Sequence, residues 1–115
     1  MLRLLSSITS FKGTKSGLMK AVKDAASLVV VDFSAEWCGP CKYLGAHLPE
    51  IADKHPSVKF LKVDIDESRE LARDFDIRVV PQVKFFKKGN EDLIPDATVI
   101  GADINAVCAT INSLS

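Results

Sequence analysis

Apolar residues follow two different periods along this chain of 115 residues. Strands are predicted in five places, over residues 7–11, 28–33, 58–63, 82–87 and 97–100. The second of these, over residues 28–33, is a continuous apolar run broken only by Asp32, which is typical of a central strand covered on both faces of a sheet. The turn-forming residues Gly89 and Asn90 lie between the last two strands and indicate a hairpin.

Between the strands, apolar residues recur every three or four positions, which predicts helices. Four helices are predicted in this way, over residues 16–26, 38–54, 67–75 and 104–114. Ser16 and Asp103 are the expected N-caps of the first and last helix. Strands that alternate with helices indicate an α/β fold, so we expect a central mixed β-sheet of about five strands flanked by four helices, with right-handed crossovers.

Cys38 and Cys41 are separated by two residues at the point where a predicted strand gives way to a helix. The free N–H groups and the positive dipole end at a helix start stabilise an anion, so Cys38 is expected to ionise at lower pH than a free thiol. Cys41 lies one turn further on, on the same face, and can close a disulfide with Cys38. Gly39 and Pro40 suit a tight turn beside a substrate and a first helical turn. The pair can therefore cycle between dithiol and disulfide.

Composition narrows the possible functions. The length fits one domain over residues 1–115, and 15 basic residues against 15 acidic residues give no net charge. This balance argues against a nucleic-acid partner or an acidic membrane, and no apolar run is as long as a membrane span. Three cysteines cannot form a secreted disulfide framework, which favours a reducing compartment. His47 and His55 lack the closely spaced second ligand pair of zinc sites, so no metal is expected.

Residues 1–6 form a short N-terminal extension before the first predicted strand. The basic and hydroxyl residues near this end, with no acidic residue before Asp24, loosely match a mitochondrial transit peptide. Cleavage further along the chain would remove a strand of the sheet. A cytoplasmic protein with an uncleaved N-terminus is therefore the favoured interpretation, and a mitochondrial protein is the alternative.

Three stretches carry a resemblance to a known family: WCGPCK at residues 37–42 with VVVDFSAE before it, Val80-Pro81, and FFKKG at residues 85–89. Together they resemble the thioredoxin family over residues 8–114, and Ser34 makes the similarity closer to eukaryotic members than to bacterial ones. The resemblance implies the thioredoxin fold and a protein disulfide reductase. In such a reductase Cys38 attacks a partner's disulfide, and Cys41 then resolves the mixed disulfide.

The residue pattern alone leaves Asp32 open. It is either a solvent-facing residue near a strand end or a carboxylate buried in an apolar strand, where burial would raise its pKa. The resemblance implies the second, with Asp32 as the proton acceptor for Cys41. It also places Lys62, otherwise an ordinary solvated lysine, beside Asp32. Most X-Pro bonds are trans, whereas the resemblance implies that the bond before Pro81 is cis.

The resemblance also implies a substrate-binding rim around the two cysteines. Its residues are Trp37, Gly39, Pro40, Val80, Pro81, Gly101 and Ala102. Val80 is expected to offer main-chain hydrogen bonds to an extended substrate. The chain departs from the family at Gln82, where most members have threonine, and in the connection over residues 90–96, which is several residues longer. Cys108 is expected to be a buried, inert thiol, with a regulatory thiol as the alternative.

No bound cofactor is implied by the resemblance. Electrons are expected from NADPH through a thioredoxin reductase, and the other implied partners are disulfide-containing proteins such as peroxiredoxin and ribonucleotide reductase. A monomer is expected. Two alternatives stay open. One is an oxidase or isomerase of the protein-disulfide-isomerase kind, against which the lack of a recognisable signal peptide and ER-retention ending counts. The other is a module that uses the scaffold to bind a protein, with redox chemistry incidental.

Overall fold

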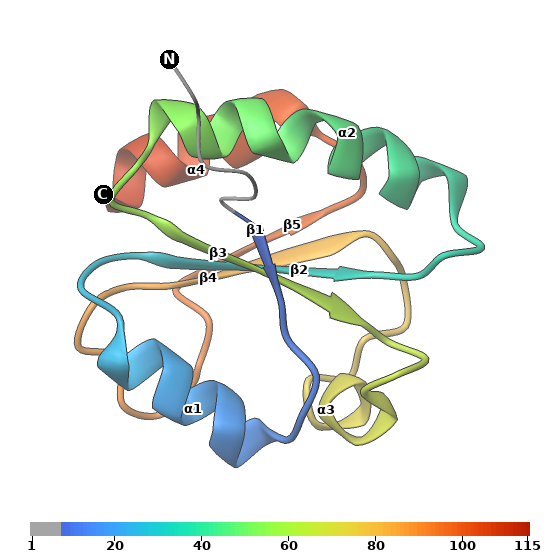
Figure 1. The fold of residues 1–115 in the computed structure, drawn as a ribbon, viewed down its shortest axis with the longest axis horizontal. Helices are drawn as coiled ribbons and strands as arrows, with labels where there is room; N and C mark the ends of the chain where they lie inside the picture. The colour runs from blue at the N-terminus through green and yellow to red at the C-terminus, as the bar shows by residue number, and fades with distance from the viewer. Residues whose placement is uncertain (1–7) are drawn as a thin grey trace.

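The computed structural model describes residues 8–115, so the extension assigned to residues 1–6 lies outside the described part of the chain. The elements are β1 (Ile8–Ser10), α1 (Lys15–Asp24), β2 (Val29–Ser34), α2 (Gly39–Lys54), β3 (Lys59–Asp64), α3 (Arg69–Asp74), β4 (Gln82–Phe86), β5 (Ala97–Ile100) and α4 (Ile104–Leu114). Figure 1 shows three layers, with α2 and α4 on one face of the sheet and α1 and α3 on the other. The predicted sheet of five strands flanked by four helices is confirmed.

The strands lie in the order β1-β3-β2-β4-β5, so the central strand is β2. It pairs in parallel with β3 and antiparallel with β4, which places Val31 opposite Leu61 on one side and Lys84 on the other. β4 and β5 form the predicted antiparallel hairpin. Because β2 lies between two other strands and ends at Ser34, its carboxyl end delivers the chain to the start of α2.

All six residues of β2 are buried, which explains its continuous apolar run. Its side chains alternate between two cores. Val30 belongs to the core beneath α2 and α4, together with Leu48 and Phe85, whereas Val31 belongs to the opposite core. That second core, beneath α1 and α3, also contains Leu18, Phe33, Leu61, Leu71 and Phe86. The sheet is therefore held by apolar packing on both faces at the strand that leads to the cysteines.

Of the two predicted helix N-caps, one is confirmed and the other is wrong. Asp103 caps α4 as predicted, since its Oδ1 accepts a hydrogen bond from the N–H of Ala106 at 2.9 Å. The prediction of Ser16 as the cap of α1 is wrong. Thr14 is the cap, with extended backbone and a hydroxyl that accepts from Gly17 N–H, so the helix begins two residues earlier than Ser16 would allow. None of the helices within residues 8–115 is long and apolar enough to cross a membrane.

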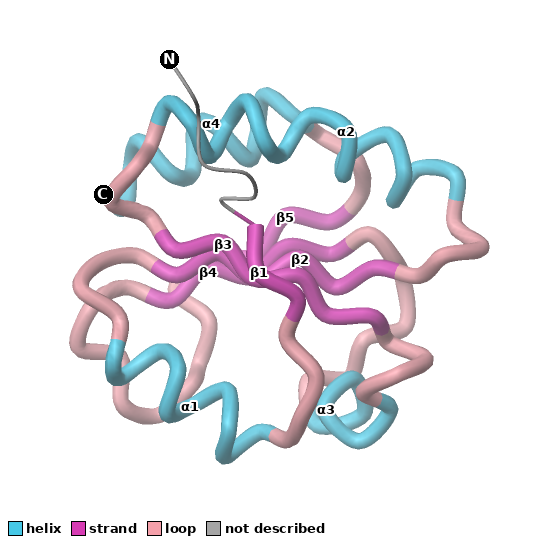
Figure 2. Tube along the Cα trace, in the orientation of Figure 1, coloured by secondary structure: helices cyan, strands magenta, loops and turns pink. Residues whose placement is uncertain are grey.

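The long connection between β4 and β5 is an ordered loop, drawn in pink in Figure 2. The Asn90 side chain organises it, since its amide nitrogen donates to Ile94 O at 2.8 Å and to Asp96 Oδ2 at 3.0 Å, and its oxygen accepts from Leu93 N–H at 2.9 Å. Leu93 has a positive φ of 56° and is only 2% exposed, within the core beneath α1 and α3. The extra residues therefore contribute a core side chain.

Replacing Leu93 should destabilise the protein. Leu93→Ala leaves a cavity in the core, and we expect the free energy of unfolding to fall by about 2–5 kcal/mol in urea denaturation. Ile94→Ala is the matched control, because Ile94 is 68% exposed in the same loop, and it should change stability by less than about 0.5 kcal/mol. Equal effects of the two substitutions would show that Leu93 does not anchor the loop.

Candidate active site

Cys38 is the N-cap of α2, with extended backbone at φ −97° and ψ 113°. Its Sγ accepts a hydrogen bond from the backbone N–H of Cys41 at 3.2 Å. Pro40 lies in the first turn of the helix, where its missing N–H leaves no hydrogen bond unmade. The two cysteines are joined by a disulfide with their Cα atoms 5.2 Å apart, so the predicted pairing is geometrically possible.

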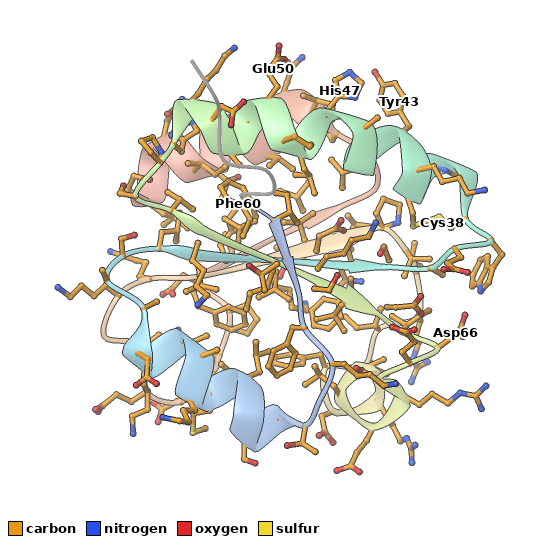
Figure 3. The ribbon with its side chains drawn as sticks, in the orientation of Figure 1. Cys38, Tyr43, His47, Glu50, Phe60 and Asp66 are labelled. Carbon is orange, nitrogen blue, oxygen red and sulfur yellow. A yellow bond between two sulfur atoms is a disulfide. The ribbon has the colours of Figure 1, made fainter. Side chains whose placement is uncertain are left out.

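The disulfide is largely shielded from solvent. Cys38 and Cys41 are both buried and form a small apolar cluster with Ala35, against which Ile65 and Val80 pack. Figure 3 shows Cys38 at the end of the molecule where β2 leads into α2. In the dithiol form, the N–H that now points at Cys38 Sγ would donate to a thiolate, and hydrogen bonds to an ionised acceptor are the stronger kind. The site therefore favours Cys38 as the nucleophile.

Asp32 is buried in the central strand, with 1% of its surface exposed. Neither of its carboxylate oxygens has a hydrogen-bond partner within the described chain. This burial raises the pKa of Asp32 to about 6, and the positive charge of Lys62 limits the rise. The alternative of a solvent-facing Asp32 is therefore wrong, and the carboxyl group is poised as a base near neutral pH.

Lys62 is both exposed to solvent and a neighbour of Asp32. It is exposed on β3, as an ordinary lysine would be, and it is also the registered neighbour of Asp32 on β2. One surface pocket is lined by Lys62, Cys41 and Ser34, among other residues. Solvent thus reaches the surroundings of the second cysteine and of the lysine that acts on Asp32.

Val80, one of the predicted rim residues, lies beside Cys38. The Val80–Pro81 bond is cis, and the carbonyl oxygen of Val80 lies 3.7 Å from Cys38 Sγ. Gly101, with a positive φ of 92°, donates its N–H to Pro81 O at 2.9 Å, which joins the loop before α4 to the same region. Gly39 and Pro40 are exposed at the helix start.

Trp37 is 68% exposed, and its indole N–H donates to Asp66 Oδ2 at 2.8 Å. This partner could not be predicted, because Asp66 is one of several acidic residues in the turn after β3. A second contact was also not predicted: the amide of Gln82 donates to Val79 O at 3.2 Å. Both contacts hold residues that flank the disulfide.

Two other residues singled out by the sequence, His47 and Cys108, make contacts elsewhere in the fold. His47 Nδ1 bonds to Tyr43 O at 2.9 Å and its ring contacts the Tyr43 ring, both on the outer side of α2 (Figure 3). No group of three or more potential metal ligands occurs among residues 8–115. Cys108 is a free thiol, partly buried against the core beneath α2 and α4 rather than fully enclosed.

The chain is similar to known proteins over most of its length. The family model described as Thioredoxin matches residues 10–112. Thioredoxin of Ovis aries is 37% identical over 102 residues, which cover 88% of this chain and 93% of that protein. Thioredoxin H-type of Picea mariana is 44% identical over 80 residues, which cover 70% of this chain and 63% of that protein, so this chain spans less than two thirds of that relative. The structure of Trichomonas vaginalis thioredoxin superposes with a TM-score of 0.89 at 37% identity, covering 95% of this chain and 98% of that one.

The raised pKa of Asp32 predicts a pH-dependent loss of stability. The Asp32 carboxyl keeps its proton up to about pH 6 in the folded state but only up to pH 3.8 in the unfolded chain. The stronger proton binding of the folded state therefore stabilises it fully below pH 3.8, and this contribution to stability is lost as pH rises through about 6. Asp32→Asn removes this titration. Each pKa unit is worth about 1.4 kcal/mol. The free energy of unfolding of the variant, taken relative to that of the unmodified protein, should therefore be higher at neutral pH than at low pH by up to about 3 kcal/mol.

Urea denaturation of the oxidised proteins at about pH 4 and about pH 7 measures this difference. Lys62→Met is the companion variant. Removing its positive charge should raise the pKa of Asp32 further, and so extend the stability loss to higher pH. A stability difference between Asp32→Asn and the unmodified protein that does not change with pH would contradict the assigned ionisation.

Proposed function

Because the chain belongs to the thioredoxin family, we propose that it is a protein disulfide reductase that cycles Cys38 and Cys41 between dithiol and disulfide. The family match and the CxxC pair together support dithiol–disulfide oxidoreductase activity. The observation that carries the proposal is the disulfide at the start of α2, in which the N–H of Cys41 points at Cys38 Sγ.

The reaction takes place in two thiol–disulfide exchanges. First, the Cys38 thiolate attacks one sulfur of a partner's disulfide; that S–S bond breaks, a mixed disulfide forms, and the other partner sulfur leaves as a thiolate and takes up a proton. Second, Cys41 loses its proton and attacks Cys38 Sγ, which breaks the mixed disulfide and releases the second partner thiol. Two electrons pass to the partner, and the protein is left with the Cys38–Cys41 disulfide.

Asp32 is proposed to accept the proton of Cys41 in the second exchange. A base works best when its pKa lies close to the working pH, and burial brings the pKa of Asp32 to about 6. Lys62 is proposed as a supporting residue, since its charge keeps that pKa from rising further. Lys62 and Cys41 also line one surface pocket, so solvent reaches both of them.

The substrate is proposed to bind as an extended segment across a rim around Cys38. Trp37, Gly39 and Pro40 are exposed on one part of this rim. Val80, Pro81 and Gly101 form the other part, where the Val80 carbonyl lies near Cys38 Sγ. An apolar, low-relief rim of this kind suits many partner sequences, because main-chain hydrogen bonds carry the recognition.

The thioredoxin family generally needs no bound cofactor. We propose that NADPH supplies the electrons through a thioredoxin reductase, and that the clients are disulfide-containing proteins such as peroxiredoxin and ribonucleotide reductase. The proposed form is a monomer, one thioredoxin domain with a short extension at residues 1–6. The proposed compartment is the cytoplasm, with the mitochondrion as the alternative that the N-terminal composition supports.

Replacement of Cys38 tests the reductase directly. Cys38→Ser should reduce insulin disulfides no faster than the background with dithiothreitol, because the attacking sulfur is lost. Cys108→Ser is the matched control and should keep the full rate, since Cys108 lies on α4 apart from the disulfide. Turnover that survives in Cys38→Ser would refute the assigned nucleophile, and an inactive unmodified protein would favour a binding module.

A kinetic experiment separates the two exchanges. Asp32→Asn should slow release of the mixed disulfide by on the order of ten- to a hundredfold, because the proton acceptor for Cys41 is gone. Formation of the mixed disulfide should change much less. Rapid mixing with an excess of disulfide substrate, followed by acid quench and mass spectrometry, measures both steps. If both steps slow equally, Asp32 does not act on Cys41.

A further inference from the structure

The segment that carries Val80 has almost no backbone hydrogen bonds. At its start, Ile77 N–H donates to Ala72 O at 2.9 Å, and at its end Pro81 O accepts from Gly101 N–H at 2.9 Å. Between these two points, residues 78–80 make no backbone–backbone hydrogen bond with any part of the chain that the structure describes. The orientation of the peptide groups beside the disulfide must therefore depend on side chains.

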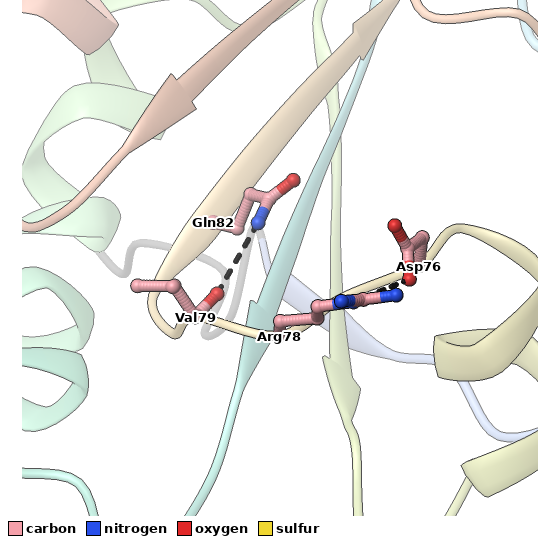
Figure 4. Close-up of polar contacts among 4 residues, drawn as sticks. All are labelled: Asp76, Arg78, Val79 and Gln82. Carbon is pink, nitrogen blue, oxygen red and sulfur yellow. Dashed lines mark hydrogen bonds and ion pairs between the residues drawn. The ribbon is translucent and has the colours of Figure 1, made fainter.

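Besides the approach of Cys38 Sγ to the Val80 carbonyl, two side-chain hydrogen bonds involve the ends of this segment, and Figure 4 shows both of them. Arg78 Nε donates to Asp76 Oδ1 at 2.8 Å, but both side chains are exposed, and solvent weakens such ion pairs. Gln82 Nε2 donates to Val79 O at 3.2 Å, and Gln82 is only 8% exposed. A carbonyl oxygen only accepts hydrogen bonds, so the amide nitrogen of Gln82 must be the atom that faces it. The buried contact is the more effective constraint.

The contact at Val79 also orients the next residue. The carbonyl of Val79 and the N–H of Val80 belong to one peptide group, which is planar. This bond is trans, since the one cis peptide bond within residues 8–115 is the following one, Val80–Pro81. In a trans peptide the C=O and N–H point in opposite directions, so the Val80 N–H points away from Gln82. That N–H has no acceptor within residues 8–115.

We infer that Gln82 is a positioning residue for substrate binding: it holds the Val79 carbonyl so that the Val80 N–H beside Cys38 is presented as a free main-chain donor. The substrate part of this inference rests on the proposed reductase function. Gln82 suits the role because it is the first residue of β4, paired with Phe33 of β2 and Ile100 of β5, and is thus fixed to the sheet on both sides. The substrates favoured by this arrangement have an extended main chain next to the reacting cysteine.

Gln82→Met tests the inference, because methionine has similar length but no donor. Lys84→Met is the matched control: Lys84 is also buried, lies on the same face of β4, and makes its contact with Thr98 rather than with the loop. Reduced protein is mixed with increasing insulin, and oxidation is followed by the fluorescence of Trp37, the single tryptophan. A small aromatic disulfide, dithiobis-nitrobenzoate, serves as a second substrate without a peptide main chain.

In Gln82→Met, the half-saturating insulin concentration should rise about fivefold, as expected for the loss of one hydrogen bond. The plateau rate and the rate with dithiobis-nitrobenzoate should stay the same, and Lys84→Met should match the unmodified protein in both. The backbone order parameter of Val80, from NMR relaxation, should fall in Gln82→Met toward the value of about 0.6 that marks flexible backbone.

Equal loss of rate with both disulfides, or an unchanged half-saturating insulin concentration, would overturn the role in substrate binding. An unchanged order parameter would overturn the positioning of Val80. If the unmodified protein does not reduce insulin, the proposed function fails, and the order parameter still decides whether Gln82 holds this peptide group.

Discussion

At the start of α2, the backbone N–H of Cys41 donates to Cys38 Sγ, and this one contact distinguishes the two cysteines. A helix end presents N–H groups that no carbonyl of the helix can satisfy, and here a sulfur takes one of them. The contact forms because β2 ends at Ser34 and α2 begins at Gly39, with Cys38 directly before the helix. Since β2 is the central strand of the sheet, the sheet fixes the position of Cys38. In the proposed reaction, Cys41, which lies inside the helix, acts second.

The same strand carries a group that opposes folding. Burying a carboxylate without a hydrogen-bond partner costs folding free energy. An apolar side chain at position 32 would avoid this cost. The fold tolerates Asp32 because apolar packing covers both faces of β2. In the proposed reaction this loss of stability has a chemical use, since the burial that raises the pKa of Asp32 makes it a better base near neutral pH. The proposed function and stability are then in conflict at one residue of the central strand.

Much of this arrangement could be predicted from residues that act locally. The apolar run of β2, the cap Asp103 and the spacing of Cys38 and Cys41 depend on neighbours in sequence, and the structure agrees with each. Contacts between distant segments could not be predicted in this way. The hydrogen bond from Trp37 to Asp66 joins two loops, and the insertion of Leu93 into the core depends on a positive φ that leucine seldom adopts. The cis bond before Pro81 followed from family resemblance, whereas X-Pro statistics favoured trans.

Ionisation of Cys38 at the helix start is the step on which the proposed chemistry depends most. Its most direct test is the rate of alkylation of Cys38 by iodoacetamide in the reduced protein, measured against pH in a Cys108→Ser background and located by mass spectrometry. Because the helix start stabilises the thiolate, we expect a half-maximal rate well below pH 8.5, which is about the midpoint for a free thiol. A midpoint at or above that value, or faster alkylation of Cys41 than of Cys38, would contradict the proposed chemistry.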